Sequence, residues 1–141
     1  MKQSNVIREK SYQFALNIIN LFQELKSNHE FVLSKQLLRS GTSIGANVEE
    51  AIGGQTRKDF FMKLNIAYKE ARETHYWLRL LSDSGLIEKN KGEKLIQECE
   101  ELQRILGSII KTIKSESVSC IVFSQYAKGV VLPLIFNSQL Q

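Results

Sequence analysis

Four basic side chains and one tyrosine recur along a single helical side between residues 58 and 79. They are Lys58, Lys69, Arg72, Tyr76 and Arg79, with Asn65 among them. The acidic residues of the same segment fall on another side, namely Asp59, Glu70 and Glu73. Because cations bind backbone phosphates and aromatic rings stack on bases, this segregation favours nucleic-acid binding. A solvated face or a seam between subunits would give the same pattern, so these two alternatives stay open.

A second polar line runs through LRSGTSIGANVEEAIGG, residues 38–54. Arg39, Ser43, Asn47 and Glu50 follow one another at helical spacing, about 120° from the apolar residues of the segment at 100° per residue. This line predicts a hydrogen-bonded seam between helices or between subunits, in which Arg39 meets a carboxylate and Asn47 pairs with backbone. Catalysis by Glu50 is disfavoured, because no second acid, metal ligand or nucleophile lies at a helical spacing that would join it.

Patterns typical of enzymes and metal sites are missing from the sequence. His29 and His75 lie far apart, and neither has a Cys or His partner at metal-ligand spacing, so no zinc site is expected. Cys99 and Cys120 are too few for a disulfide framework, and Cys99 falls among apolar residues, where a buried thiol is the commoner arrangement. No Gly-x-Ser-x-Gly nucleophile motif occurs. We therefore expect a non-enzymatic protein without cofactor or metal.

Apolar residues at steps of three and four predict four helices that would position these side chains. The predicted core positions are Phe14, Ile18, Leu21 and Leu25; Leu37, Gly41, Ile44, Val48 and Ala51; Phe60, Leu64, Ala67, Ala71, Thr74, Leu78 and Leu81; and Leu95, Cys99, Leu102, Leu106, Ile109 and Ile113. The expected turns and caps are SNHE (27–30), Gly53 and Gly54, Thr56 with Asp59, SDSG (82–85), and Asn90 with Glu93.

Short turns between amphipathic helices predict an all-α, up-down-up-down four-helix bundle over residues 1–116. The chain has 141 residues, 43% of them hydrophobic, which is enough for one core. Its single proline, Pro133, leaves the first 132 residues free to form long helices. The capped breaks make a folded-back bundle more favourable than one long coiled coil.

Two glycines four residues apart, Gly41 and Gly45, lie inside the second predicted helix beside Ser43 and Ala46. Each glycine costs about 1 kcal/mol relative to alanine in a helix interior. Close approach of a partner helix to this small-residue face would offset that cost. A phosphate-binding P-loop is excluded, because Gly45 is followed by Ala46 and Asn47 rather than by Lys and Ser or Thr.

Residues 117–141 form an apolar tail in which Lys128 is the only charged residue. Polar and helix-breaking residues, including Lys128 and Pro133, interrupt the tail, so no membrane span is predicted. CIVFSQY and GVVLPLIF have a composition that would suit a short hairpin. We favour an extension that is poorly structured or packed on a neighbouring subunit. The polar start, MKQSNVIREKSYQF, gives no sign of an export signal.

The run LLRSGTSIGANVEEA, with KDFFMKLNIAYKEARETHYWLRLL and the turn SGLI, resembles the small bacterial four-helix-bundle proteins of the 23S rRNA intervening-sequence family. The motif on the family's second helix maps onto Arg39, Ser43, Ile44, Asn47 and Glu50. The resemblance implies a ring-shaped homopentamer. It also implies kinship with the accessory variability determinant proteins of diversity-generating retroelements, which bind nucleic acid and a reverse transcriptase.

The residues and the resemblance together predict a cytoplasmic, homo-oligomeric helical protein that binds RNA or another nucleic acid. The net charge of +4 is mild, so the prediction depends on where the charges lie rather than on their sum. The competing hypothesis is a structural protein–protein interaction scaffold, in which the basic stripe is an assembly seam. Phosphate contacts weaken steeply with salt, whereas an apolar protein interface responds little, so salt distinguishes the two.

Overall fold

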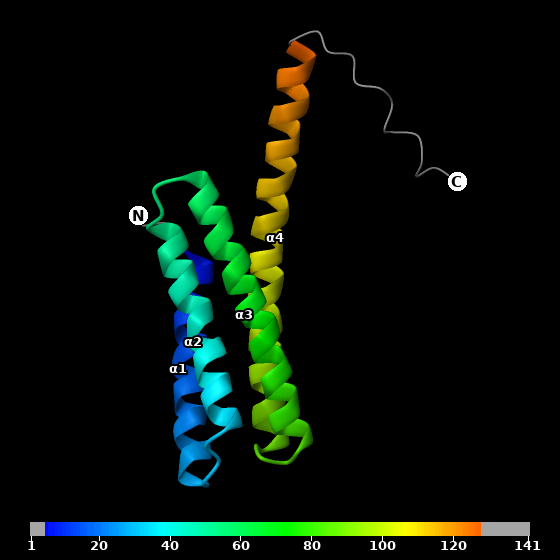
Figure 1. The fold of residues 1–141 in the computed structure, drawn as a ribbon. Helices are drawn as coiled ribbons and strands as arrows, with labels where there is room; N and C mark the ends of the chain where they lie inside the picture. The colour runs from blue at the N-terminus through cyan, green and yellow to red at the C-terminus, as the bar shows by residue number, and fades with distance from the viewer. Residues whose placement is uncertain (1–4, 128–141) are drawn as a thin grey trace, which may run out of the picture. The chain divides into compact units, whose positions relative to one another are not determined.

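The described part of the chain is entirely helical outside its turns. The computed structural model describes residues 5–127, which form four helices: α1 (Val6–Ser27), α2 (Leu33–Ile52), α3 (Arg57–Asp83) and α4 (Lys89–Ala127). Figure 1 shows α1 to α3 and the beginning of α4 running side by side. The predicted all-α four-helix bundle is therefore confirmed.

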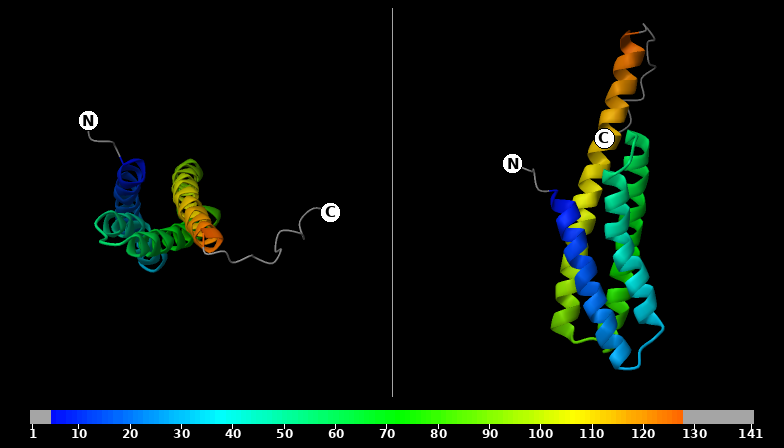
Figure 2. Two further views of the ribbon diagram at one scale, coloured as in Figure 1. Left: turned by 90° about the horizontal axis from the view of Figure 1, so that it is seen from above. Right: turned by 90° about the vertical axis from the view of Figure 1, so that its left-hand side faces the viewer.

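Consecutive helices are neighbours, and the fourth helix returns to the first. α2 packs against both α1 and α3. The start of α4 joins α3, where the Cys99 thiol donates to the Ala71 carbonyl at 3.2 Å, and also joins α1, where the Asn17 amide donates to Glu98 at 2.9 Å. Viewed along the helices, each of the four has two such neighbours (Figure 2). This is the up-down-up-down order that short turns favour.

The core consists largely of the predicted apolar positions. Phe14, Ile18, Leu21 and Leu25 of α1 are buried, as is the complete stripe on α2 from Leu37 to Ala51. Phe60, Ile109 and Ile113 are only half-buried. On α4 the buried face moves around the helix axis after Leu106, so that Ile110 is buried in place of Ile109. A straight helix has 3.6 residues per turn, so the buried face drifts from any fixed heptad line.

Helix ends are capped by side chains, one of which the sequence pattern did not reveal. Thr56 caps α3, accepting from the Asp59 backbone N–H at 3.1 Å as expected. The start of α2 is capped by Glu30, whose carboxylate accepts from the backbone N–H groups of Val32, Leu33 and Ser34. Burial raises the pKa of Glu30, but these backbone hydrogen bonds outweigh it and leave the pKa below its usual value.

The fourth helix differs from its predicted boundaries at both ends. It begins at Lys89, so Asn90 lies within its first turn and is not a cap. At the other end it continues without a break at residue 116, where the bundle was expected to end, and reaches Ala127. No glycine or proline occurs between Gly107 and Gly129 to stop it. CIVFSQY (120–126) is thus helical rather than a hairpin strand, while residues 128–141 lie outside the described part.

The glycine face of α2 brings that helix close to α1. A Cβ atom on Gly41 would lie 2.9 Å from two side-chain carbons of Ile18, and one on Gly45 would lie 3.4 Å from the Ser11 carbonyl oxygen. Real Cβ atoms almost never approach to 2.9 Å, so a side chain at position 41 forces the buried Ile18 side chain or the helix that carries it to shift. The close helix contact predicted from the glycine spacing is present.

We expect the substitution Gly41→Leu to lower the free energy of unfolding by about 1–3 kcal/mol or more, because it overpacks the contact with Ile18. Gly107→Ala is the matched control. Its new methyl group would meet only the Tyr68 ring at an ordinary 3.6 Å, so helix propensity should raise stability by up to ~1 kcal/mol. Urea unfolding followed by circular dichroism measures both. An unchanged curve for Gly41→Leu would contradict the close contact.

Candidate nucleic-acid-binding face

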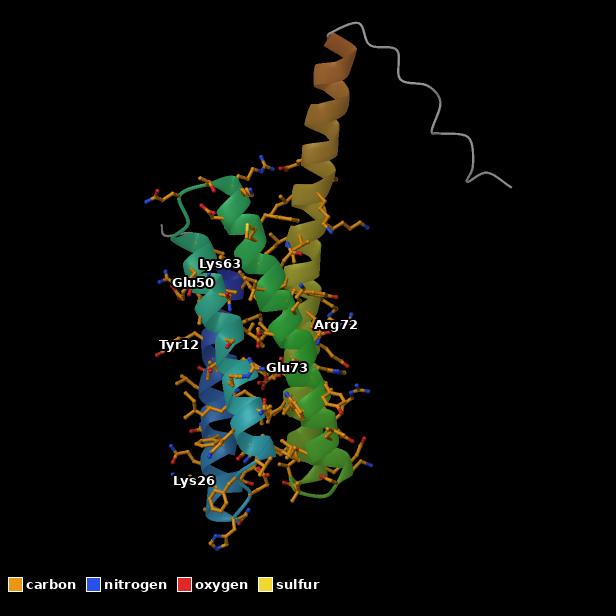
Figure 3. The ribbon with its side chains drawn as sticks, in the orientation of Figure 1. Tyr12, Lys26, Glu50, Lys63, Arg72 and Glu73 are labelled. Atoms are coloured by element: carbon orange, nitrogen blue, oxygen red, sulfur yellow. The ribbon has the colours of Figure 1, made fainter. Side chains whose placement is uncertain are left out.

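The basic residues predicted to contact phosphate all lie on the solvent side of α3. Lys58, Lys69, Arg72 and Arg79 are exposed, and the core-facing side of the helix is formed by other residues, such as Ala67, Ala71 and Leu78. We call the first four residues, together with Tyr76, the α3 cationic stripe. Arg72 lies on the flank of α3 away from α2, whereas Glu73 lies on the flank toward α2 (Figure 3). The predicted segregation of charge is therefore present in three dimensions.

The four cations of the stripe have no ionic partner in the part of the chain that the structure describes. Within the described residues, none of them makes an ion pair or side-chain hydrogen bond. Other cations of the bundle do have partners, such as Arg8 with Glu49 and Lys63 with Glu50. Unpaired cations on one face produce a local positive potential that a mild net charge conceals. This face is free to attract an anionic polymer.

Tyr76 lies in the middle of the stripe with its ring open to solvent. The residue is 47% exposed. Arg72 precedes it by four positions and Arg79 follows it by three, so that a guanidinium stands one helical turn away on each side. The ring meets the indole of Trp77 edge-on, at a centroid distance of 5.0 Å and an angle of 65°. The Trp77 indole N–H in turn donates to Glu73 at 3.1 Å.

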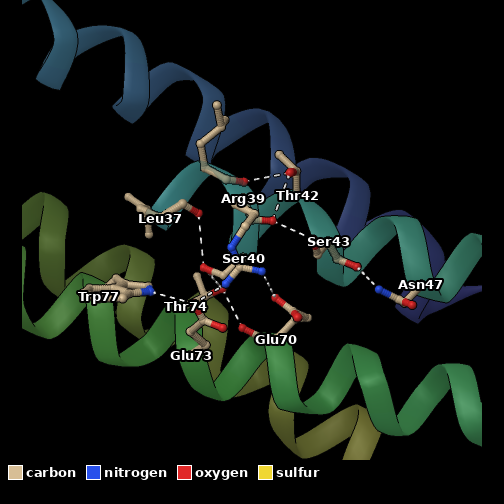
Figure 4. A network of polar contacts seen from close by, with 11 residues as sticks. Leu37, Arg39, Ser40, Thr42, Ser43, Asn47, Glu70, Glu73, Thr74 and Trp77 are labelled. Atoms are coloured by element: carbon tan, nitrogen blue, oxygen red, sulfur yellow. Dashed lines mark hydrogen bonds and ion pairs between the residues drawn. The ribbon is translucent and has the colours of Figure 1, made fainter. Parts of the chain in front are cut away.

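The polar line on α2 forms a seam with α3 inside one chain (Figure 4). Arg39 pairs with Glu73 and, at 3.5 Å, with Glu70. Beneath this pair, the hydroxyls of Ser40 and Thr74 lie 3.0 Å apart and are fully buried. Ser40 was not recognised in the sequence, although it follows the core residue Leu37 by three positions and so faces inward. The seam fixes α3 against α2.

The other residues of the family motif bond mainly within their own helix. The Ser43 hydroxyl donates to the Arg39 carbonyl at 2.7 Å, and the Asn47 amide donates to the Ser43 carbonyl at 2.8 Å. Glu50 pairs with Lys63 across the α2–α3 junction. Ile44 is a core residue. The expected partners, a carboxylate for Arg39 and backbone for Asn47, are thus both found in the same chain rather than across subunits.

Cysteine and histidine side chains serve catalysis in other proteins, but Cys99 and His75 make structural contacts here. Burial raises the pKa of the Cys99 thiol to about 12, so the sulfur stays protonated at neutral pH. His75 contacts Glu100 of α4 at 3.2 Å. Among residues 5–116, whose side chains the structure describes, no group of His, Cys, Asp and Glu side chains is arranged to hold a metal ion. In that same range, no helix is long and apolar enough to cross a membrane.

The fold and this face together define a small all-α bundle with a charged surface on its third helix. The model of the 23S rRNA-intervening sequence protein family matches residues 3–108, and the chain belongs to that family. It is also similar to a crystal structure from Bacteroides thetaiotaomicron, a protein of unknown function from the S23 ribosomal protein family. The two chains are 50% identical with a TM-score of 0.73, over 74% of this chain and 98% of the other. A comparison with curated proteins gives no match.

The seam should make stability depend on pH. The hydrogen bond from Arg39, followed by that from Trp77, lowers the pKa of Glu73 below its usual 4.5. A lowered pKa in the folded state stabilises the fold above pH 4.5, and this contribution is lost as the pH falls through the folded-state pKa. We expect Glu73→Gln to cost about 1 kcal/mol at pH 7 and to flatten the acid limb of the stability profile.

Urea unfolding between pH 7 and acid pH measures this effect. Glu93→Gln is the control, because Glu93 forms only an exposed contact with Lys89 at 4.0 Å. If the two variants lose stability equally at every pH, the seam makes no specific contribution.

Proposed function

We propose that this protein is a non-enzymatic nucleic-acid-binding protein and that the α3 cationic stripe contacts the phosphates. RNA is the first candidate ligand. The observation that carries the proposal is the set of four exposed cations on one helical face with no anionic partner among the described residues. Cations that are already ion-paired would have to break those pairs before binding phosphate. These four bind phosphate without that cost.

The family supports a connection with ribosomal RNA, although its description refers to the intervening sequence in 23S rRNA and not to a measured activity. The similar Bacteroides protein is likewise placed in a ribosomal protein family while its function is unknown. The resemblance to accessory variability determinant proteins extends the proposal to a second partner, a reverse transcriptase or another protein. Cytoplasmic localisation fits all of these partners.

We also propose that the chain assembles into a homo-oligomer, a pentamer by family resemblance. Tyr12, Leu16 and Ile19 form an exposed apolar line on α1, with Tyr12 64% exposed. Such a line suits contact with another copy of the chain and lies on a different helix from the cationic stripe. Assembly would repeat the stripe around the particle, so individually weak phosphate contacts add up. The apolar tail is a candidate second contact between subunits.

The alternative is a scaffold in which the stripe itself is an assembly seam. We expect the double substitution Arg72→Gln and Arg79→Gln to leave folding and assembly intact, because both residues are exposed and Gln keeps helix propensity nearly constant. RNA affinity and the slope of its salt dependence should both fall, the slope by roughly 0.7–0.9 per lost phosphate contact.

Fluorescence anisotropy at several salt concentrations measures this effect. The control removes two exposed cations elsewhere, Lys26 at the end of α1 and Lys94 on α4, and should change affinity less. Collapse of assembly in the Arg72/Arg79 variant would identify the stripe as a seam. Absence of RNA binding by the unmodified protein at ~50 mM salt, where phosphate contacts are strongest, would leave the scaffold function.

Assembly itself is tested by light scattering. We expect a particle whose mass is several times the 16.1 kDa of one chain. Replacing both Tyr12 and Leu16 by Glu should reduce this mass without changing helix content, because the two side chains are exposed in the single chain. Val32→Glu is the control, since Val32 is 72% exposed but lies at the α1–α2 turn. A monomer of the unmodified protein at micromolar concentration contradicts the proposal.

A further inference from the structure

Tyr76 offers a flat aromatic face at the centre of an unpaired cationic surface, which phosphate binding alone does not require. Lys69, Arg72 and Arg79 would suffice to hold a phosphate backbone. An aromatic side chain left half-exposed loses the free energy that burial would give. Tyr76 lies between two arginines, each one helical turn away. This matches the arrangement in which a base stacks on an aromatic ring while cations hold the flanking phosphates.

The ring is also held in place by the α2–α3 seam. Arg39 binds Glu73, Glu73 accepts the Trp77 indole N–H, and the indole and the Tyr76 ring meet in a T-shaped contact. The contact restricts the tilt of the tyrosine ring, while the residue remains 47% exposed. A ring oriented before binding loses less conformational entropy on binding than a freely rotating one. The residues that join α2 to α3 therefore position Tyr76 as well.

A free aromatic face discriminates between kinds of nucleic acid. In a duplex both faces of each base are already stacked, and recognition proceeds mainly through the backbone and shape. An unpaired strand has bases that can rotate out and stack on the tyrosine. A site made of cations alone would show the opposite preference, because a duplex carries more charge per unit length.

We infer that the α3 cationic stripe binds unpaired strands in preference to duplex, with Tyr76 stacking on one base while Arg72 and Arg79 hold the phosphates on either side. This inference rests on the proposed nucleic-acid-binding function and names its ligand class. From Lys69 to Arg79 the stripe extends about 15 Å at 1.5 Å per residue, which suits a few nucleotides per subunit. Asp83, exposed one turn beyond Arg79, limits the stripe at that end.

The experiment compares a ~12-nucleotide RNA with the same RNA annealed to its complement, at equal salt, by anisotropy of a fluorescein label on the full-length protein. We expect the single strand to bind on the order of tenfold more tightly. Tyr76→Leu should remove this preference while leaving the affinity for duplex unchanged. Tyr76→Phe, which keeps the aromatic face, should retain it. Circular dichroism confirms that both variants fold.

The single tryptophan provides a second readout from within the site. Trp77 is the only tryptophan in the chain and touches the Tyr76 ring. A base stacked on Tyr76 should therefore change the Trp77 emission during titration with single strand, and duplex should not. This change should persist in Tyr76→Phe and disappear in Tyr76→Leu.

The outcomes separate this inference from the function on which it rests. Equal or tighter binding of duplex, or a single-strand preference that survives in Tyr76→Leu, overturns the inference and leaves phosphate binding by the stripe intact. Absence of binding to both RNAs at ~50 mM salt overturns the proposed function together with the inference.

Discussion

The buried stripe of α3, which runs from Leu64 to Leu81, sets which way the helix faces, and the pairing of Arg39 with Glu70 and Glu73 reinforces that orientation. Arg39 extends from α2 and draws both carboxylates to the inner flank of α3, above the buried contact between Ser40 and Thr74. Because successive residues on a helix are separated by 100°, fixing the acidic flank also fixes the direction of every other side chain on α3. The four cations of the α3 cationic stripe point to solvent, and none of them has an acidic partner among the described residues. The ion-pair network therefore supports the α2–α3 contact on the same side of α3 that leaves its charged outer face toward solvent.

The opposite side of α2, which faces α1, carries glycines and therefore occupies almost no space. Gly41 and Gly45 let α1 approach to within van der Waals contact, so α2 is packed from both sides. The two flanks use different physical means. The α1 side has the close approach at the glycines, whereas the α3 side adds the Arg39 ion pairs and the Ser40–Thr74 hydrogen bond to its apolar packing. A single twenty-residue helix, Leu33–Ile52, therefore positions the two helices that carry the proposed interaction surfaces.

The distribution of surface features is consistent with a protein that assembles and binds a polyanion at the same time. The exposed apolar line lies on α1 and the unpaired cations lie on α3, so that one surface remains accessible when the other is covered. Repetition of the stripe in an assembly would give a strong combined interaction from a chain with a net charge of only +4. The Arg39 network links stability to this surface, because the residues that join α2 and α3 also orient the Tyr76 ring through Trp77.

The sequence by itself determined the helices, the bundle and the family. Apolar spacing depends only on the helical period, so the spacing alone assigns Leu37, Ile44, Val48 and Ala51 to the core, where all four are buried. It also separated the basic and acidic sides of α3. It did not identify the partner of Arg39, because ion pairs between helices join residues whose distance in sequence carries no pattern. The pairing of Arg39 with Glu73 was decided by tertiary packing. The cap that Glu30 provides is local, but glutamate is not among the residue types that usually cap helices, so the sequence pattern did not reveal it. The length of α4, by contrast, follows from the sequence, which has no glycine or proline between Gly107 and Gly129, although a change in apolar spacing obscured that signal.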